Sequence, residues 1–285
     1  MVNYRHRHHA GSAHDLVKHL VLVTLLRRLN ERTSPWCFLD THAGEGWYEL
    51  AGSETSEAEE GIGCFLARER AIRHPLLHAF AERLRAFTGP RNPPARYPGS
   101  SALAALLARP SDRLVLVDTT VTPRLPFPAP AGGARVHVHR RDGFEALEGL
   151  LPPAEGRGLV LVDPPYEKRD ESSRLADGLA RAVRRFPAGR FLAWYPLSPR
   201  VVPPRLRGGT EAAEILHLEA VWDARAAVRG TGLIIVRPSE ECRGALLEAC
   251  QELLTLLGRP AHLTVRFEGG GTERRAHAHR HPGTQ

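Results

Sequence analysis

One short stretch, Asp163-Pro164-Pro165-Tyr166, contains the residue types with the most specific chemistry in the sequence. The exocyclic amine of adenine is a poor nucleophile because its lone pair is delocalised into the ring, so its N–H groups need acceptors. The Asp163 carboxylate and the Pro164 carbonyl are two such acceptors, and the prolines stiffen the loop that holds them. Tyr166 offers a flat apolar face for a base extruded from its stack. The stretch predicts direct methyl transfer to an amine, with Asp163, Pro164 and Tyr166 as catalytic residues; the alternative is a turn that only caps a buried strand.

Three other apolar segments are each followed by glycines or an acid. A glycine turn that includes Gly44 follows residues 36–40, and it allows a ligand to approach the backbone closely. Asp118 ends the next segment and suits ribose hydroxyls, whereas Asp142-Gly143 follows a third and suits an adenine amine. Each carboxylate alone could be a solvated strand end, but three such signals together favour a cofactor that contains adenosine. The chain has neither a P-loop pattern nor G-x-G-x-x-G, which favours S-adenosylmethionine over a nucleoside triphosphate or NAD.

These residues need a sheet that brings the strand ends together. The apolar pattern predicts strands over residues 36–40, 113–118, 135–139, 158–163, 190–195, 213–222, 232–237 and 262–267, and helices over 13–31, 101–108, 174–186 and 240–257. Strands that alternate with helices predict an α/β fold with a mainly parallel sheet, helices on both faces and an antiparallel hairpin at the edge. Ligands bind such sheets at the carboxyl ends of the strands, where the topology reverses.

Residues 51–97 interrupt the alternation and are predicted to be a helical insertion, with helix from about 61 to 87. Removing them restores ordinary spacing between the Gly44 turn and Asp118. The main domain is then predicted to comprise residues 1–50 and 98–268, with 1–14 as a basic segment that contacts the substrate. Residues 269–285 have little to bury and are predicted to be disordered.

The composition favours a polyanionic partner. The chain has 285 residues, a formal net charge of +7 and a sequence pI of about 9.7, which speeds association with nucleic acid. The histidine-rich N-terminus lacks acidic or cysteine ligands, and the four cysteines lack zinc or disulfide spacing, so no metal is expected. Only two lysines occur, Lys18 and Lys168, against 37 arginines, so we hypothesise that the chemistry needs Lys18. No signal peptide or membrane-spanning run is visible, which predicts a cytoplasmic protein without a membrane partner.

Several motifs together are similar to one family. The chain resembles the bacterial 23S ribosomal RNA adenine-N6 methyltransferases of the J type over about residues 4–267. The motifs that carry the resemblance are Tyr-Arg-His at 4–6, His-Ala-Gly at 9–11, Asp15, Lys18-His19, Leu-Asp-Thr-His-Ala-Gly at 39–44, Tyr-Pro-Gly-Ser at 97–100, Asp-Gly-Phe at 142–144, Asp-Pro-Pro-Tyr-Glu at 163–167 and Trp-Tyr-Pro at 194–196.

The resemblance implies a Rossmann-like class I S-adenosylmethionine-dependent methyltransferase that methylates N6 of a specific adenine in 23S ribosomal RNA, and it implies no protein partner beyond that RNA. It also implies that several of the residues named above contact the cofactor. Together with Gly44 of the glycine turn and with Lys18, they form the predicted cofactor set: Lys18, His19, His42, Gly44, Ser100, Asp118, Asp142, Gly143 and Asp163. The predicted substrate set is Tyr4, His6, Lys18 and Tyr166. The sequence departs from the family at Asp118, where the family has Glu, and over the proline-rich residues 119–133.

Alternatives with the same chemistry stay open. The substrate could be adenine in DNA or in another RNA, or a protein glutamine side chain, since glutamine methyltransferases use a similar loop. The basic N-terminus favours nucleic acid, and no helix-turn-helix or other DNA reader is evident. A noncatalytic RNA-binding protein that keeps the fold is a further alternative, against which the intact Asp163-Pro164-Pro165-Tyr166 stretch argues.

Overall fold

A computed structural model gives the fold of residues 9–50, 56–125, 134–206, 210, 213–223, 225–238, 240–259, 261–268 and 274–277. Within these residues, nine strands form one mixed sheet in the order β11-β10-β8-β9-β7-β6-β1-β4-β5. The strands are β1 (Cys37–Asp40), β4 (Arg113–Asp118), β5 (Arg135–Arg140), β6 (Gly158–Val162), β7 (Arg190–Leu197), β8 (Ile215–Val221), β9 (Gly230–Val236), β10 (His262–Glu268) and β11 (Arg274–His277). The five strands from β5 to β7 run parallel, and the other four pair antiparallel.

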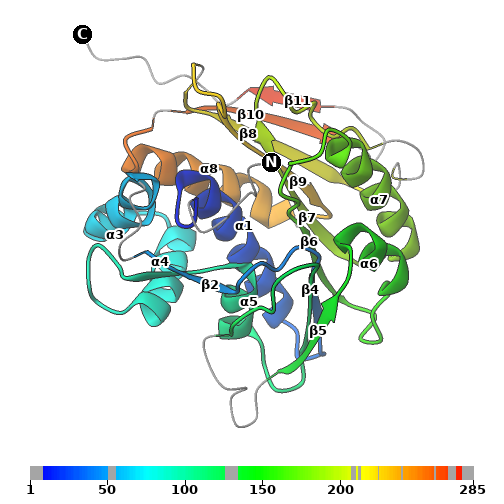
Figure 1. Cartoon of the computed structure of the whole chain (residues 1–285). Helices are drawn as coiled ribbons and strands as arrows, with labels where there is room; N and C mark the ends of the chain where they lie inside the picture. The colour runs from blue at the N-terminus through cyan, green and yellow to red at the C-terminus, as the bar shows by residue number, and fades with distance from the viewer. Residues whose placement is uncertain are drawn as a thin grey trace.

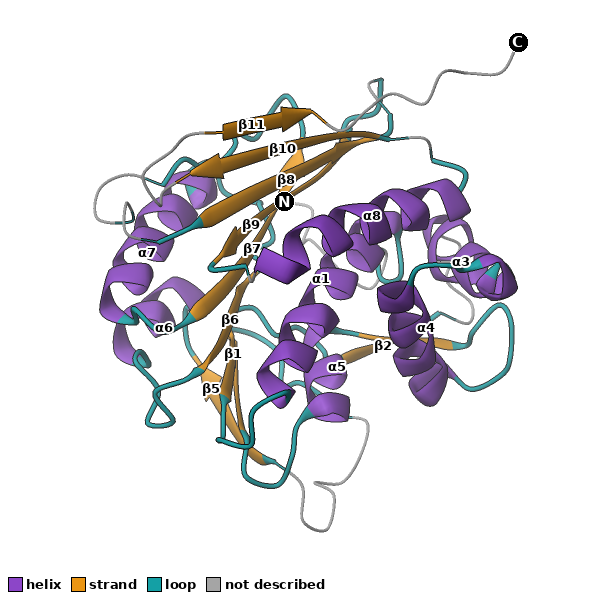
Figure 2. Ribbon diagram, turned by 180° about the vertical axis from the view of Figure 1, so that it is seen from behind, coloured by secondary structure: helices purple, strands orange, loops and turns teal. Residues whose placement is uncertain are grey.

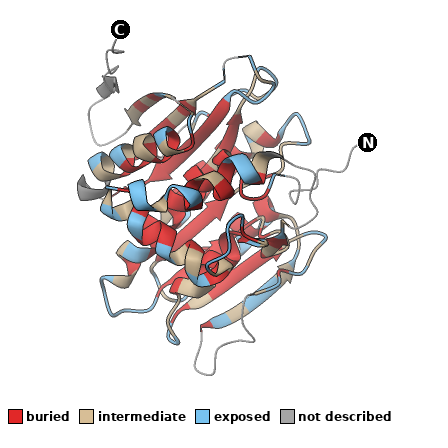
Figure 3. Ribbon diagram, turned by 90° about the vertical axis from the view of Figure 1, so that its left-hand side faces the viewer, coloured by how far each residue is buried: buried red, intermediate tan, exposed pale blue. Residues whose placement is uncertain are grey.

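Helices cover both faces of the sheet (Figures 1 and 2). One face carries α1 (Ala13–Asn30), α5 (Ser100–Leu107) and α8 (Glu240–Leu256), and the other carries α6 (Gly143–Gly149) and α7 (Glu171–Arg185). Alternate residues of each strand belong to two separate hydrophobic cores, one on each face of the sheet. Phe38 and Leu161 pack toward α1, whereas Leu39 and Val160 pack toward α6 and α7. The strands are therefore apolar on both faces, which is why short uninterrupted apolar runs predicted them. Figure 3 shows this buried interior between exposed outer helix faces.

Helix α1 is buried on nearly all sides. Fourteen of its 18 residues are buried, including the charged Asp15 and Lys18. It contacts α5 and α8 and the helix α4 of the insertion as well as the sheet. A helix enclosed in this way carries apolar residues all round instead of on one stripe.

The insertion stands outside the α1 face of the sheet. It contains α2 (Ser56–Ala58), a π-helical turn (Glu59–Gly63), α3 (Cys64–Ala67), a 3-10 turn (Glu69–Ala71) and α4 (Pro75–Thr88). The segment predicted to be helical from about 61 to 87 is divided into several helices. His74 caps a new helix whose first residue is Pro75, a residue that starts helices readily but disrupts their interior. Two short strands, β2 (Trp47–Glu49) and β3 (Arg96–Pro98), pair antiparallel at its base.

The C-terminal tail also differs from the expectation. Residues 274–277 form β11, an edge strand that pairs antiparallel with β10, so four residues of the segment predicted to be disordered are in the sheet. Backbone hydrogen bonds at a free sheet edge form without apolar side chains, and this is why composition did not indicate the strand. Among the described residues, no helix is long and apolar enough to cross a bilayer.

Candidate active site

Four carboxylates meet at one edge of the sheet. Asp40, Asp118, Asp142 and Asp163 stand at the carboxyl ends of β1, β4, β5 and β6 or directly after them, and these strands are parallel neighbours. The sheet reverses its direction of growth at β1, which pairs with β4 on one side and β6 on the other. This is the edge at which α/β sheets bind ligands.

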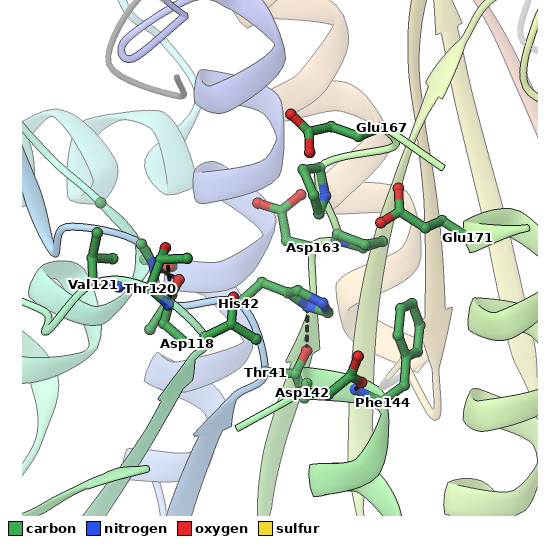
Figure 4. A pocket seen from close by; sticks show the side chains of 18 of the residues that line it. Thr41, His42, Asp118, Thr120, Val121, Asp142, Phe144, Asp163, Glu167 and Glu171 are labelled. Atoms are coloured by element: carbon green, nitrogen blue, oxygen red, sulfur yellow. Dashed lines mark hydrogen bonds between the residues drawn. The ribbon is translucent and has the colours of Figure 1, made fainter. Parts of the chain in front are cut away.

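A cavity of about 660 Å³ opens at this edge, within the size range of small-molecule sites. Figure 4 shows Asp118, Asp142 and Asp163 around it, with His42 between them. All nine residues of the predicted cofactor set line it: Lys18, His19, His42, Gly44, Ser100, Asp118, Asp142, Gly143 and Asp163. Pro164 lines it too, whereas Tyr166 is not among the lining residues.

Asp163 is held by Lys18. The Lys18 ammonium donates to Asp163 Oδ2 at 2.6 Å and lies 2.9 Å from Asp15 Oδ1. Burial alone would lower the pKa of Lys18, but the carboxylates of Asp15 and Asp163 outweigh it and raise that pKa above its usual value. Lys18 is therefore a fixed cation, and no described residue donates a hydrogen bond to the other oxygen of Asp163, Oδ1.

Tyr166 lies behind the motif loop and packs against β7. Its hydroxyl donates to the carbonyl of Trp194 at 2.9 Å, and the two rings meet edge to face with centroids 5.7 Å apart. Its backbone has φ of 55°, a left-handed conformation that is uncommon for a residue with a bulky side chain. Burial, and then the nearby Asp163 and Glu171, raise the pKa of Tyr166, so the side chain is a neutral surface and not a base. The contacts with Trp194 fix the shape of the loop that carries Asp163.

Two glycines that line the floor of the cavity are in close contact with neighbouring residues. A Cβ on Gly143 would lie 2.1 Å from the Thr41 carbonyl oxygen and 2.7 Å from the His42 ring. Gly44 has φ of +60°, and a Cβ there would lie 2.4 Å from the Tyr48 hydroxyl. Gly143 needs to be glycine because the Thr41 backbone touches it, and Gly44 needs to be glycine because of its left-handed backbone and the adjacent Tyr48 hydroxyl.

His42 is a neutral side chain in this floor. Burial lowers its pKa to about 4, its Nδ1 is 2.8 Å from the Thr41 hydroxyl, and its ring meets Phe144 edge to face at 5.3 Å. A neutral imidazole between three carboxylates leaves the cavity with a net negative lining, which suits a cationic ligand.

Asp118 and Asp142 also order their own loops. Asp118 accepts hydrogen bonds from the Gly44 N–H at 3.1 Å and from the Thr120 N–H at 2.8 Å. Asp142 caps α6 and takes a two-oxygen contact from Arg174, each at 3.0 Å. Burial opposes ionisation of Asp142, but the Arg174 hydrogen bonds and the helix cap lower its pKa. Both side chains are therefore held in place as hydrogen-bond acceptors at the cavity edge.

Two further residues of the predicted cofactor set, His19 and Ser100, are held by hydrogen bonds to other elements. His19 Nδ1 is 2.7 Å from the Tyr97 hydroxyl, and the two rings stack. Ser100 donates to Asp40 Oδ2 at 2.6 Å, and burial raises the pKa of Asp40 to about 7. Asp40, Arg174 and Asp15 were not predicted as site residues, because their partners lie on other elements and the sequence carries no signal for such contacts.

Tyr4 and His6 lie outside the described residues. No group of three or more possible metal ligands occurs among the residues that the structure describes.

Known proteins match this chain along most of its length. The family described as "Ribosomal RNA large subunit methyltransferase D, RlmJ" matches residues 33–267. The chain is similar to two proteins named ribosomal RNA large subunit methyltransferase J. The one from Escherichia coli (strain K12) is 34% identical over 253 residues, covering 84% of this chain and 88% of the relative. The one from Haemophilus influenzae is 31% identical over 251 residues, with the same coverage of 84% and 88%.

A solved structure is similar to the fold. A crystal structure of a protein from Legionella pneumophila str. Philadelphia 1 superposes with a TM-score of 0.79 at 26% identity, covering 92% of this chain and 99% of that one. The expected Rossmann-like methyltransferase fold and the expected family are thereby confirmed. The chain belongs to the RlmJ family of ribosomal RNA large subunit methyltransferases.

Proposed function

We propose that the protein transfers the methyl group of S-adenosylmethionine to N6 of a specific adenine in 23S ribosomal RNA. The observation that carries this proposal is the position of Asp163 at the cavity edge, with one oxygen on the buried Lys18 and the other without a donor among the described residues. An acceptor of this kind suits an amine that must be aligned before it can attack. The methyltransferase family supplies the reaction class.

The cavity fits the proposed donor. S-adenosylmethionine, when bound, supplies an electrophilic methyl group carried on a sulfonium. The side chains of Asp118 and Asp142 suit its ribose hydroxyls and adenine amine, and the tight backbone at Gly143 suits a flat base. The Asp40 carboxyl and the neutral His42 add no positive charge that would repel a sulfonium.

The side chains near Asp163 have separate parts in the reaction. Oδ1 of Asp163 accepts an N–H of the adenine amine and orients its lone pair, and it receives the proton that the nitrogen loses after transfer. Lys18 fixes the position of Asp163 through its hydrogen bond to Oδ2. The buried Pro164 keeps its carbonyl in one orientation, as a second acceptor for the amine. Tyr166 and Trp194 support the loop from behind.

The loop between β8 and β9 contacts α1 and the end of β7, and it suits RNA. Trp222, at the end of β8, packs against His14 of α1 with centroids 4.6 Å apart, and the Arg229 N–H donates to the carbonyl at the end of β7 at 2.7 Å. Arg225 and Arg229 are exposed, and Val228 is 40% exposed. Exposed guanidinium groups beside an apolar surface fit phosphates and splayed bases.

The test is transfer of radiolabelled methyl groups from S-adenosylmethionine to protein-free 23S ribosomal RNA, with DNA and protein glutamine substrates in parallel. Label in N6-methyladenine of the RNA is expected, at one position on mapping. Label only in DNA or in protein would keep the fold and the donor but overturn the ribosomal RNA substrate. Labelling at many positions would overturn the specificity.

A further inference from the structure

Asp15 is a buried carboxylate with no part in the reaction described above. It lies in the first turn of α1 and is 2% exposed. One oxygen pairs with the Lys18 ammonium at 2.9 Å, and the other accepts from the Gly11 N–H at 3.1 Å. Lys18 therefore lies between two carboxylates, Asp15 and Asp163, and its charge is shared by both.

The sharing of the Lys18 ammonium between two carboxylates makes Asp163 a stronger hydrogen-bond acceptor. An ammonium paired with Asp163 alone would neutralise it and compete with the substrate amine for its lone pairs. With Asp15 as the second partner, the group of three carries a net charge of −1, so Asp163 stays a strong acceptor while its position is fixed. Exposed fractions of 4% for Lys18 and 15% for Asp163 mean that water screens this interaction little.

The insertion contacts Gly11, the residue whose N–H donates to Asp15. The Ile62 N–H of its π-helical turn donates to the Gly11 carbonyl at 2.9 Å. Gly11 has φ of +80°, and a Cβ there would lie 2.9 Å from Ile62. A Cβ on Gly61 would lie 2.0 Å from the Gly11 carbonyl oxygen. The turn therefore packs closely against Gly11, whose N–H donates to Asp15. Turns of the π-helical type recur at functional sites.

We propose that Asp15 is a positioning residue for methyl transfer, which the insertion holds through Gly11 and which shares the Lys18 ammonium with Asp163. The insertion thereby couples the position of Gly11 to the catalytic carboxylate. Because the role of Asp163 belongs to the proposed function, this inference rests on that function.

Other titratable groups also face Asp163, and the substitution of Asp15 replaces none of them. Lys18 reaches it from α1, Asp40 and His42 from the end of β1, and Tyr166 from its own loop. A difference between wild type and an Asp15 variant therefore reports the shared ammonium.

The test is the pH dependence of kcat/KM for Asp15→Asn with 23S ribosomal RNA. Asp112→Asn is the matched control: Asp112 is also fully buried, accepts backbone N–H groups and pairs with an arginine three residues away, but its partner is Arg109, whereas the partner of Asp15 is the Lys18 ammonium that also pairs with Asp163. Asp15→Asn is expected to lower kcat by about 100-fold. It should also move the acid limb of the profile to lower pH, because the substitution removes one negative charge from the group that Lys18 holds together. The control should lose stability but keep the limb.

An unmoved limb, or equal losses of kcat in both variants, would overturn the positioning role. Failure of the proposed function looks different: wild type would not methylate the RNA, or Asp163→Ala would be as active as wild type.

A second pair of variants tests the contact between the insertion and Gly11. Gly61→Ala places a Cβ against the Gly11 carbonyl, whereas Gly63→Ala, in the same turn, meets only atoms at 3.5 Å and beyond. Gly61→Ala should lower kcat by about tenfold or more, and its loss should not add to that of Asp15→Asn, because both act through one contact chain. Activity equal to that of Gly63→Ala, or fully additive losses, would overturn the coupling.

Discussion

Replacing Gly143 by alanine should separate cofactor binding from the integrity of the fold. The added Cβ would lie 2.1 Å from the Thr41 carbonyl oxygen, 2.7 Å from His42 Cε1 and 2.9 Å from His42 Nε2. A relaxed carbon-to-oxygen contact is about 3.3 Å, so α6 and the β1 loop must separate by about 1 Å. Overpacking of this size costs about 1–3 kcal/mol. Since the displaced loops are the floor of the cavity, the cost falls on cofactor affinity, by about 5- to 150-fold.

Calorimetric titration with S-adenosylmethionine and a thermal melt without ligand measure the two effects. Gly149→Ala is the control, because Gly149 ends the same helix and its Cβ would meet only the flexible Arg141 guanidinium at 3.3 Å. The expected result is weaker cofactor binding by Gly143→Ala and unchanged binding by Gly149→Ala. Wild-type affinity in Gly143→Ala would refute the assignment of this floor to the cofactor.

Two further predictions concern pH and salt. Burial lowers the pKa of His14 and of His42 to about 4, so between about pH 6.5 and pH 4 the unfolded chain gains two histidine protons that the folded chain does not. Burial raises the pKa of Asp40 to about 7, so the folded chain gains one proton there over the same range and offsets one of the two. Stability to urea should therefore fall by about 1.4 kcal/mol per pH unit as the pH decreases, and a flat or opposite trend would contradict the burial of the histidines. Arg225→Ala with Arg229→Ala should reduce the salt-dependent slope of RNA binding by about 1–2 and leave cofactor affinity unchanged; an unchanged slope would exclude this loop from the RNA contact.

The sequence predicted the sheet well because each central strand is a short apolar run bounded by turn residues. Strands such as β6 are buried on both faces, and this burial favours a continuous apolar run, here valine and leucine at the four positions after Gly158. Strands β2 and β3 were missed, since three residues are too few for a periodic pattern.

The site could be predicted where a residue follows a strand directly. Asp118, Asp142 and Asp163 all lie at strand ends, so the order of elements places them together. The partners of these acids could not be found in this way. Arg174 reaches Asp142 because α7 packs beside α6, and Asp15 reaches Asp163 only through Lys18. Both contacts depend on packing between elements that are distant in sequence.

The proposal that Asp163 acts on the N6 amine is tested most directly by nucleoside analysis of 23S ribosomal RNA after reaction with wild type and with Asp163→Asn. Asparagine keeps the size of the side chain but loses its negative charge, so the fold and the cavity are preserved. We predict N6-methyladenine from wild type, a rate lower by about 100- to 1,000-fold in the variant, and cofactor affinity within a few-fold of wild type. N6-methyladenine formed at the wild-type rate by Asp163→Asn would contradict this role of the carboxylate.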